Sequence, residues 1–191
     1  RPEMSVPDLQ FSLTAASIDA PRPGSKELIR HTWPGMTIAS SQVRPYSRGY
    51  VHINSADPND HPTTQLAFLD DERDQAAQLA GLKLARALIN HPNMSSCVVS
   101  ETAPGADVQT DGELLDFIRA TGGSIHHPVG SVRMGGGDAP LDERLRVRGV
   151  HGLRVVDASI MPNLVSGNTN GPTIMIAEKG SDMILEEARN A

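Results

Sequence analysis

Apolar and polar residues alternate in the first third of the chain, and this period of two predicts short β-strands. The alternation covers residues 8–17, 37–43 and 49–54, with a fourth, weaker segment at residues 64–69. A stretch rich in proline and glycine, residues 19–35, separates the first two segments and predicts a loop. The first part of the chain is therefore expected to form a small sheet of short strands.

Three other segments show the spacing of a helix. Residues 71–89 are rich in Ala, Leu, Gln, Arg and Lys, and their apolar positions recur on one face. Residues 111–121 follow Thr110, which together with Glu113 forms the pattern of a capping box. A last helix is expected over residues 171–188.

Two clusters of charge favour structural roles over catalytic ones. Residues 72–74, Glu-Arg-Asp, stand at the start of the first predicted helix and are expected to face solvent. Arg44 and Arg48 flank a turn between two predicted strands, so structural or interfacial contacts are the expectation for both.

The pattern changes after residue 124. Residues 129–137 carry glycines and little regular spacing, while residues 145–150 and 153–157 predict strands, the second apolar enough to be buried in a sheet. With the last helix they resemble the strand–loop–helix unit that closes an α/β sheet. The predicted class is α/β, with an α+β portion that contains an antiparallel sheet over residues 1–124 and the closing unit over residues 125–191.

Composition argues against several classes of function. The net charge is −6 without a dense basic run, and the aromatic content is 3%, so a nucleic-acid partner is not expected. No apolar run approaches the roughly 20 residues that span a bilayer. The single cysteine, Cys97, cannot form an internal disulfide and is expected to be a small buried apolar residue. The expectation is an ordinary globular protein with a cytoplasmic location.

The first candidate catalytic segment is residues 124–137, SIHHPVGSVRMGGG. A histidine on a stiff loop beside glycines suits general base catalysis, because histidine titrates near neutral pH. Pro128 restricts His127 toward extended backbone, where adjacent side chains point opposite ways, so at most one of His126 and His127 should face a given site. A hydrogen-bonded structural histidine is the competing interpretation. No ligand spacing typical of zinc is present, and no metal is expected.

Residues 155–173, VVDASIMPNLVSGNTNGPT, form the second candidate region. The predicted buried strand ends at Asp157, and a loop rich in Ser, Asn and Gly leads into the last helix. In open α/β sheets, ligands bind at the carboxyl ends of strands and at helix N-termini. Asn168 and Asn170 offer hydrogen-bond donors and acceptors there. The same residues would also suit a capped loop without a ligand.

Taken in order, these segments resemble the C-terminal signature of the glucose–methanol–choline (GMC) oxidoreductases, in a version similar to the choline-dehydrogenase-like branch. The His-Pro-Val-Gly-Thr-like segment that ends in Arg-Met-Gly corresponds to residues 127–135. The family's next three blocks correspond to residues 145–150 (LRVRGV), 152–162 (GLRVVDASIMP) and 166–173 (SGNTNGPT). Upstream, residues 44–49 resemble a strand turn of the family's substrate domain.

The resemblance implies an FAD enzyme that oxidises a small-molecule alcohol to an aldehyde or ketone. It assigns residues 1–124 to the substrate-binding domain, and residues 125–191 to the active-site loop and the closing segment of an FAD-binding, Rossmann-like domain. It implies that His127 takes the hydroxyl proton while the carbinol hydride passes to flavin N5. Asn168 would hydrogen-bond the substrate oxygen.

Four further positions correspond to the family's contacts with the cofactor. Asp157 and Ala158 match the place where the chain meets the ribityl and pyrophosphate groups of FAD. Asn170 and Thr173 match the helix start that approaches the isoalloxazine ring. The resemblance therefore implies a cofactor site that the last loop and the last helix share.

The sequence departs from the family's pattern at three points. Ser131 replaces the usual threonine, and His126 stands where an aromatic residue is frequent. The phosphate-binding GxGxxG fingerprint is absent, so the implied partner is an N-terminal FAD-binding portion of the same protein. Association with a second copy of the chain is left open.

Two other interpretations compete with the alcohol oxidoreductase. A hydroxynitrile lyase is an activity that also occurs on this fold with bound FAD. The third interpretation is a non-catalytic fragment that lacks the N-terminal half.

Overall fold

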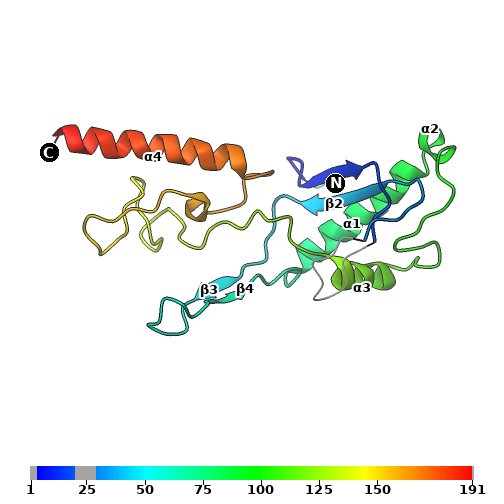
Figure 1. Ribbon diagram of the computed structural model, residues 1–191, viewed down its shortest axis with the longest axis horizontal. Coiled ribbons are helices and arrows are strands. Elements are labelled where there is room, and N and C mark those ends of the chain that lie inside the picture. Colours follow the sequence, from blue (N-terminus) through cyan, green and yellow to red (C-terminus); the bar gives the residue numbers. More distant parts are fainter. Residues whose placement is uncertain (1–3, 20–28, 191) are drawn as a thin grey trace. The chain divides into compact units, whose positions relative to one another are not determined.

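The structure is a computed structural model that describes residues 4–19 and 29–190; residues 20–28 of the predicted loop therefore lie outside the described part. Figure 1 labels the elements in chain order: β1 (Leu9–Thr14), β2 (Thr37–Gln42), β3 (Tyr50–His52), β4 (Thr63–Gln65), α1 (Glu72–Ile89), α2 (Pro92–Ser95), α3 (Asp111–Thr121) and α4 (Asn170–Asn190). A short 3-10 turn, η1 (Ala158–Ile160), precedes α4. This combination of helices and antiparallel strands confirms the predicted mixed class.

The contacts divide the chain into two compact units. Unit 1 takes in Arg1–Arg48 and Ala67–Ile125, and unit 2 takes in Gly49–Leu66 and His126–Ala191. The assignment of residues 1–124 to a substrate-binding portion and of residues 125–191 to an FAD-binding segment stays a prediction.

Unit 1 is a two-stranded antiparallel sheet covered by α1. β1 and β2 pair from Leu9 opposite Gln42 to Thr14 opposite Thr37, as the alternation predicts. α1 packs on both strands and against α3. Gly81 lies at the contact of α1 with β2, where an added Cβ would come within 2.8 Å of a serine hydroxyl. The helix can approach the sheet this closely because glycine has no side chain.

The two long helices of unit 1 begin at side-chain caps. The carboxylate of Asp71 accepts a hydrogen bond from the backbone N–H of Arg73 at the start of α1. The predicted capping box of α3 is confirmed: Thr110 Oγ1 accepts from the N–H of Glu113 at 3.3 Å, and Glu113 Oε2 accepts from the N–H of Thr110 at 2.9 Å. Hydrogen bonds from the backbone and side chain of Thr110 lower the pKa of Glu113.

Asp74 is buried, which corrects the expectation that residues 72–74 all face solvent. Asp74 is 2% exposed, and its carboxylate accepts hydrogen bonds from the N–H groups of Tyr46 and Ser47 at 2.9 and 2.7 Å and from Gln42 Nε2 at 2.8 Å. Burial acts to raise the pKa of Asp74, but these hydrogen bonds outweigh it and lower the pKa overall. The buried carboxylate of Asp74 therefore connects α1 to the turn at Tyr46 and Ser47, which precedes β3.

Arg48 has the structural role expected for it. Its Nη1 donates to three backbone carbonyls of its own turn, those of Pro45, Tyr46 and Ser47. The guanidinium and the Asp74 carboxylate thus satisfy backbone groups of the same turn, which fixes its conformation.

Cys97 is exposed, so the expectation of a buried cysteine is wrong. It lies just after α2, a single helical turn that begins at Pro92. The sequence pattern does not predict this turn because four residues are too few to show a helical period.

The β3–β4 hairpin belongs to unit 2. Tyr50, Val51 and His52 pair with Gln65, Thr64 and Thr63 in antiparallel register. β4 is shorter than the segment predicted over residues 64–69, because Ala67 and Leu69 have φ values of 53° and 63°. Such left-handed residues end an extended segment.

The strands predicted over residues 145–150 and 153–157 are not formed. In these described residues, pairing is limited to single bridges, such as the one between Arg146 and Arg154. Leu145 has φ 62°, and Gly149 and Gly152 are also left-handed, so the backbone cannot continue into a ladder. The segment is nevertheless buried in part, and the core of unit 2 consists of Leu141, Leu145, Ile160, Met161 and Ile176.

α4 packs over this core. As in α1, a glycine lets the helix come close to its neighbour. An added Cβ on Gly180 would lie 2.4 Å from Val156 Cγ1. Ion pairs of Arg144 with Glu186 and of Arg154 with Glu187 join the C-terminal half of α4 to residues 144–154. None of the helices in residues 4–19 and 29–190 is long and apolar enough to cross a membrane.

We expect Asp74→Ala to lower the free energy of unfolding by about 1–3 kcal/mol, because it leaves the part-buried N–H groups of Tyr46 and Ser47 without their acceptor. Urea unfolding followed by far-UV circular dichroism measures this. The control is Glu72→Ala, an exposed acid of the same helix start, with an expected change within about 0.5 kcal/mol. Equal losses in the two variants would contradict the assignment.

The ionisation of Asp74 should make the free energy of unfolding depend on pH. Because the pKa of Asp74 is lowered from its ordinary 3.8, its contribution to stability is complete above pH 3.8 and is lost as the pH falls through the lower folded-state value. The difference in stability between the wild type and Asp74→Asn should therefore shrink below pH 3.8. A difference that stays constant through this range would argue against an ionised Asp74.

Gly180→Ala should destabilise unit 2 by about 1–3 kcal/mol, because the new methyl group overlaps Val156. Thermal unfolding monitored by circular dichroism gives the comparison with Gly171→Ala. Gly171 lies in the same helix with no atom within 4 Å of an added Cβ, so its substitution should be neutral or stabilising. A neutral Gly180→Ala would show that α4 does not pack this closely on Val156.

Candidate active site

His127 lies between two residues that precede α4. Its Nδ1 is 2.9 Å from Thr169 Oγ1, and its Nε2 is 2.7 Å from Asn168 Nδ2. Segments about 40 residues apart in the sequence thus meet at one imidazole ring. The two residues predicted to be catalytic, His127 and Asn168, are in direct hydrogen-bond contact.

The orientation of the Asn168 amide sets the tautomer of the ring. An amide nitrogen only donates, so the His127 Nε2 that faces it must accept. In the neutral ring, the proton then lies on Nδ1, which donates to Thr169 Oγ1. This leaves a lone pair on Nε2, which is the form that can take a proton from a hydroxyl group.

η1 connects the loop of His127 to α4. The N–H groups of Val132 and Met134 donate to the carbonyls of Ser159 and Ile160 at 3.1 and 2.8 Å. η1 in turn packs on α4. The loop that follows His127 is therefore held by the same short turn that contacts the helix after Asn168.

Asp157 and Ala158 stand at the start of this turn. The Asp157 carboxylate accepts from the backbone N–H and the hydroxyl of Ser159, which orders the first residues of η1. The expectation that Asp157 and Ala158 contact a cofactor stays a prediction. Their observed role is to shape η1.

Asn170 and Thr173 lie in the first turn of α4, directly after the His127 contacts. Asn170 is exposed, and the Thr173 hydroxyl donates to the carbonyl of Thr169 at 2.7 Å. The Thr173 N–H donates to the same carbonyl at 2.9 Å. The first turn contains no acidic residue, so the partial positive charge of the helix N-terminus is not neutralised there.

Thr169 is the site residue that the sequence analysis does not identify. It is buried, with 8% of its surface exposed. A signal was available: a threonine directly before a helix usually caps through the N–H of the second or third helical residue. Here the third helical residue is Pro172, which has no N–H. A threonine with one of its usual donors missing is a candidate for a hydrogen bond elsewhere.

The backbone at His126 is not extended, contrary to the expectation for the two adjacent histidines. Its φ is 63°, in the left-handed region. His127, the next residue, makes the contacts with Asn168 and Thr169. The geometry therefore favours His127 over its neighbour as the residue that faces this site.

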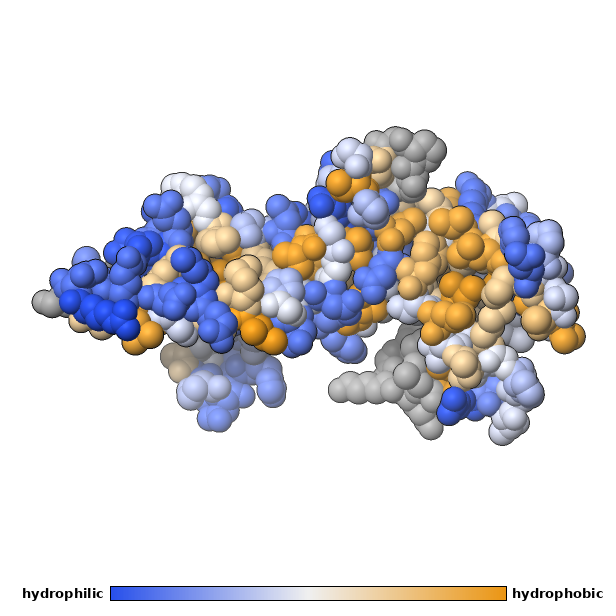
Figure 2. All heavy atoms as spheres, turned by 90° about the horizontal axis from the view of Figure 1, so that it is seen from above, coloured by the Kyte–Doolittle hydropathy of each residue, from blue (hydrophilic) through white to orange (hydrophobic). Residues whose placement is uncertain are grey.

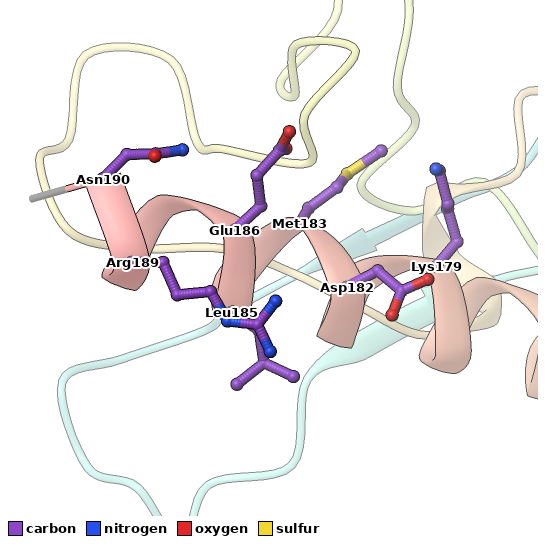
Figure 3. A pocket seen from close by; sticks show the side chains of 7 residues that line it. All are labelled: Lys179, Asp182, Met183, Leu185, Glu186, Arg189 and Asn190. Atoms are coloured by element: carbon purple, nitrogen blue, oxygen red, sulfur yellow. The ribbon is translucent and has the colours of Figure 1, made fainter.

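A hollow of about 470 Å³ lies elsewhere on unit 2. Figure 3 shows its lining on the C-terminal half of α4: Lys179, Asp182, Met183, Leu185, Glu186, Arg189 and Asn190. Glu186 is already paired with Arg144, whose hydrogen bond lowers the pKa of Glu186. Because no predicted site residue lines this hollow, it is separate from the candidate site. Across the described residues, no group of three or more His, Cys, Asp or Glu side chains could hold a metal ion.

Comparison with known families matches the chain to a family model. The family model described as GMC oxidoreductase, in its C-terminal part, matches residues 45–177. This range includes His127 and Asn168, together with the four predicted cofactor-binding positions.

Curated relatives match almost the whole chain. An alcohol dehydrogenase [acceptor] of Pseudomonas putida is 40% identical over 187 residues, which are 97% of this chain and 33% of the relative. An oxygen-dependent choline dehydrogenase of Pseudomonas aeruginosa (strain UCBPP-PA14) is 39% identical over 179 residues, 93% of this chain and 31% of the relative. The chain thus spans about a third of the length of these relatives.

Solved structures share the fold. A pyridoxine 4-oxidase from Mesorbium loti superimposes with a TM-score of 0.81 and 29% identity, over 92% of this chain and 34% of the other. An FAD-dependent oxidoreductase from Chaetomium thermophilum gives a TM-score of 0.77 and 31% identity, over 81% of this chain and 27% of the other.

Proposed function

The chain belongs to the GMC oxidoreductase family, and we propose that it acts as the C-terminal part of an FAD-dependent alcohol dehydrogenase or oxidase. The observation that carries the proposal is the pair of contacts that His127 makes with Asn168 and Thr169. The ring is oriented by two partners, and its Nε2 acts as an acceptor. The relatives named as alcohol and choline dehydrogenases support an alcohol as the substrate.

The start of α4 fits the flavin of FAD. Gly167 and Gly171 have no atom within 4 Å of an added Cβ, so the backbone beside Asn168 is open to a ligand. Ile174 and Met175 are 55% and 60% exposed and offer apolar surface to a flat ring. The helix N-terminus, free of acidic side chains in its first turn, favours negative charge.

We assign the four predicted cofactor-binding positions to two parts of FAD, given the exposed surface at the start of α4. Asn170 and Thr173, in the first turn of α4, would border the isoalloxazine ring. Asp157 and Ala158 would meet the ribityl and pyrophosphate groups, with Asp157 acting through the shape of η1. When bound, FAD supplies the acceptor for the hydride, at N5 of its isoalloxazine ring.

The residues of this chain would handle the proton and the substrate oxygen. His127 Nε2 accepts the hydroxyl proton of the alcohol as the carbinol hydride leaves. Asn168 Nδ2 donates to the same oxygen while negative charge develops on it. The substrate oxygen would replace Nε2 as the acceptor of the Asn168 N–H, which frees the Nε2 lone pair for the hydroxyl proton; the two nitrogens are 2.7 Å apart, close enough to flank one oxygen. Nδ1 keeps its proton and its bond to Thr169 throughout.

An N-terminal FAD-binding portion of the same protein is the proposed partner. The chain has no GxGxxG fingerprint, and several large apolar side chains of the described residues are exposed, among them Leu13, Trp33 and Ile53. Figure 2 shows that the C-terminal end of α4 is hydrophilic, while apolar side chains are more frequent toward its N-terminal half. Burial of such surface is favourable at about 25 cal/mol per Å², so it suits a covering partner.

We expect His127→Ala to slow flavin reduction by alcohols about 10²- to 10⁴-fold, the usual contribution of a general base. The measurement is anaerobic stopped-flow absorbance of the flavin-loaded protein that contains this chain. The matched control is His126→Ala, for which a rate close to wild type is expected. A normal rate in His127→Ala, with loss of activity in His126→Ala, would overturn the assignment of the base. Cleavage of a cyanohydrin without flavin reduction by any alcohol would overturn the oxidoreductase itself.

A further inference from the structure

We propose that Thr169 is a positioning residue: its hydroxyl holds the Nδ1 proton of His127 and thereby keeps Nε2 directed at the substrate. The proposal rests on the proposed function, because it assumes that His127 is the base. Thr169 touches the ring on the side away from Nε2, so it acts through His127 and not on the substrate.

Thr169 is held more firmly than a surface threonine. It is buried, and its carbonyl accepts both the N–H and the hydroxyl of Thr173. Its β-branched side chain restricts χ1, so the hydroxyl has few alternative positions. The acceptor for Nδ1 is therefore fixed at the first turn of α4 before any substrate arrives.

The hydroxyl suits both protonation states of His127. In the neutral ring, Thr169 Oγ1 accepts the bond from Nδ1–H while Nε2 faces Asn168. After Nε2 takes a proton, both ring nitrogens are donors, and the same Nδ1–H bond to Thr169 remains. Proton uptake then requires no movement of the ring, which is the preorganisation that a general base needs.

Removal of the hydroxyl has a specific consequence. In Thr169→Val, a methyl group of similar shape faces Nδ1, and the part-buried N–H of the ring loses its acceptor there. The ring can avoid this by moving its proton to Nε2 or by rotating. Either change removes the lone pair from the position where the alcohol binds.

The test compares Thr169→Val with Thr169→Ser, which restores the hydroxyl. The flavin-loaded protein is labelled with ¹⁵N-histidine, and ring ¹H–¹⁵N correlations identify the tautomer of His127, assigned by the signal that disappears in His127→Gln. We expect the Nδ1–H signature in the wild type, its loss in Thr169→Val, and its return in Thr169→Ser. Ser181→Ala, which removes another hydroxyl from α4, should keep the signature.

Kinetics give the second readout. Thr169→Val should lower the limiting rate of flavin reduction about tenfold, which corresponds to one hydrogen bond of about 1.4 kcal/mol, without a change in the affinity for the alcohol. Thr169→Ser should recover the rate to within about threefold of the wild type.

Two results would overturn the proposal. One is an unchanged tautomer and rate in Thr169→Val, and the other is a serine variant as impaired as the valine variant. A wild-type rate of flavin reduction in His127→Gln would instead overturn the proposed function. The tautomer signal of His127 does not depend on that rate, so it tests the role of Thr169 separately.

Discussion

The site depends on one constraint, the contact of both His127 ring nitrogens with two consecutive residues, Asn168 and Thr169. The two residues directly precede Asn170, the first residue of α4. The exposed partner, Asn168, faces the ring with its amide nitrogen, which only donates, and the buried partner, Thr169, offers a hydroxyl that can accept. Together they set both the orientation of the ring and the location of its proton.

The packing of unit 2 maintains this contact. The loop after His127 hydrogen-bonds to η1, Asp157 orders η1, and η1 packs on α4. The core beneath includes Ile160 from η1 and Ile176 from α4, and Gly180 allows the helix to approach Val156. Packing and hydrogen bonds of residues that do not touch the ring thus hold the two segments that meet at the imidazole.

Features encoded locally could be predicted from the sequence, while features that depend on distant residues could not. The helix at residues 111–121 was predictable because Thr110 and Glu113 cap it within one turn. Local patterns left His127 and Asn168 in two separate candidate regions, and only the resemblance to the GMC family joined them in one site. The burial of Asp74 depends on donors 27 to 32 residues earlier in the chain, and the missing strands reflect the left-handed backbone of Leu145. The burial of Asp74 has no local sequence signal, whereas Gly149 and Gly152 were a local signal against continuous strands.

We propose that His127 and Asn168 face the flavin and share one substrate oxygen. A crystal structure of the flavin-loaded protein that contains this chain, with an unreactive alcohol analogue, tests it most directly. We expect an oxygen of the analogue within about 3.2 Å of both His127 Nε2 and Asn168 Nδ2, beside N5 of the flavin. An analogue oxygen held by other residues, with the His127 ring separated from the flavin by protein, would contradict it.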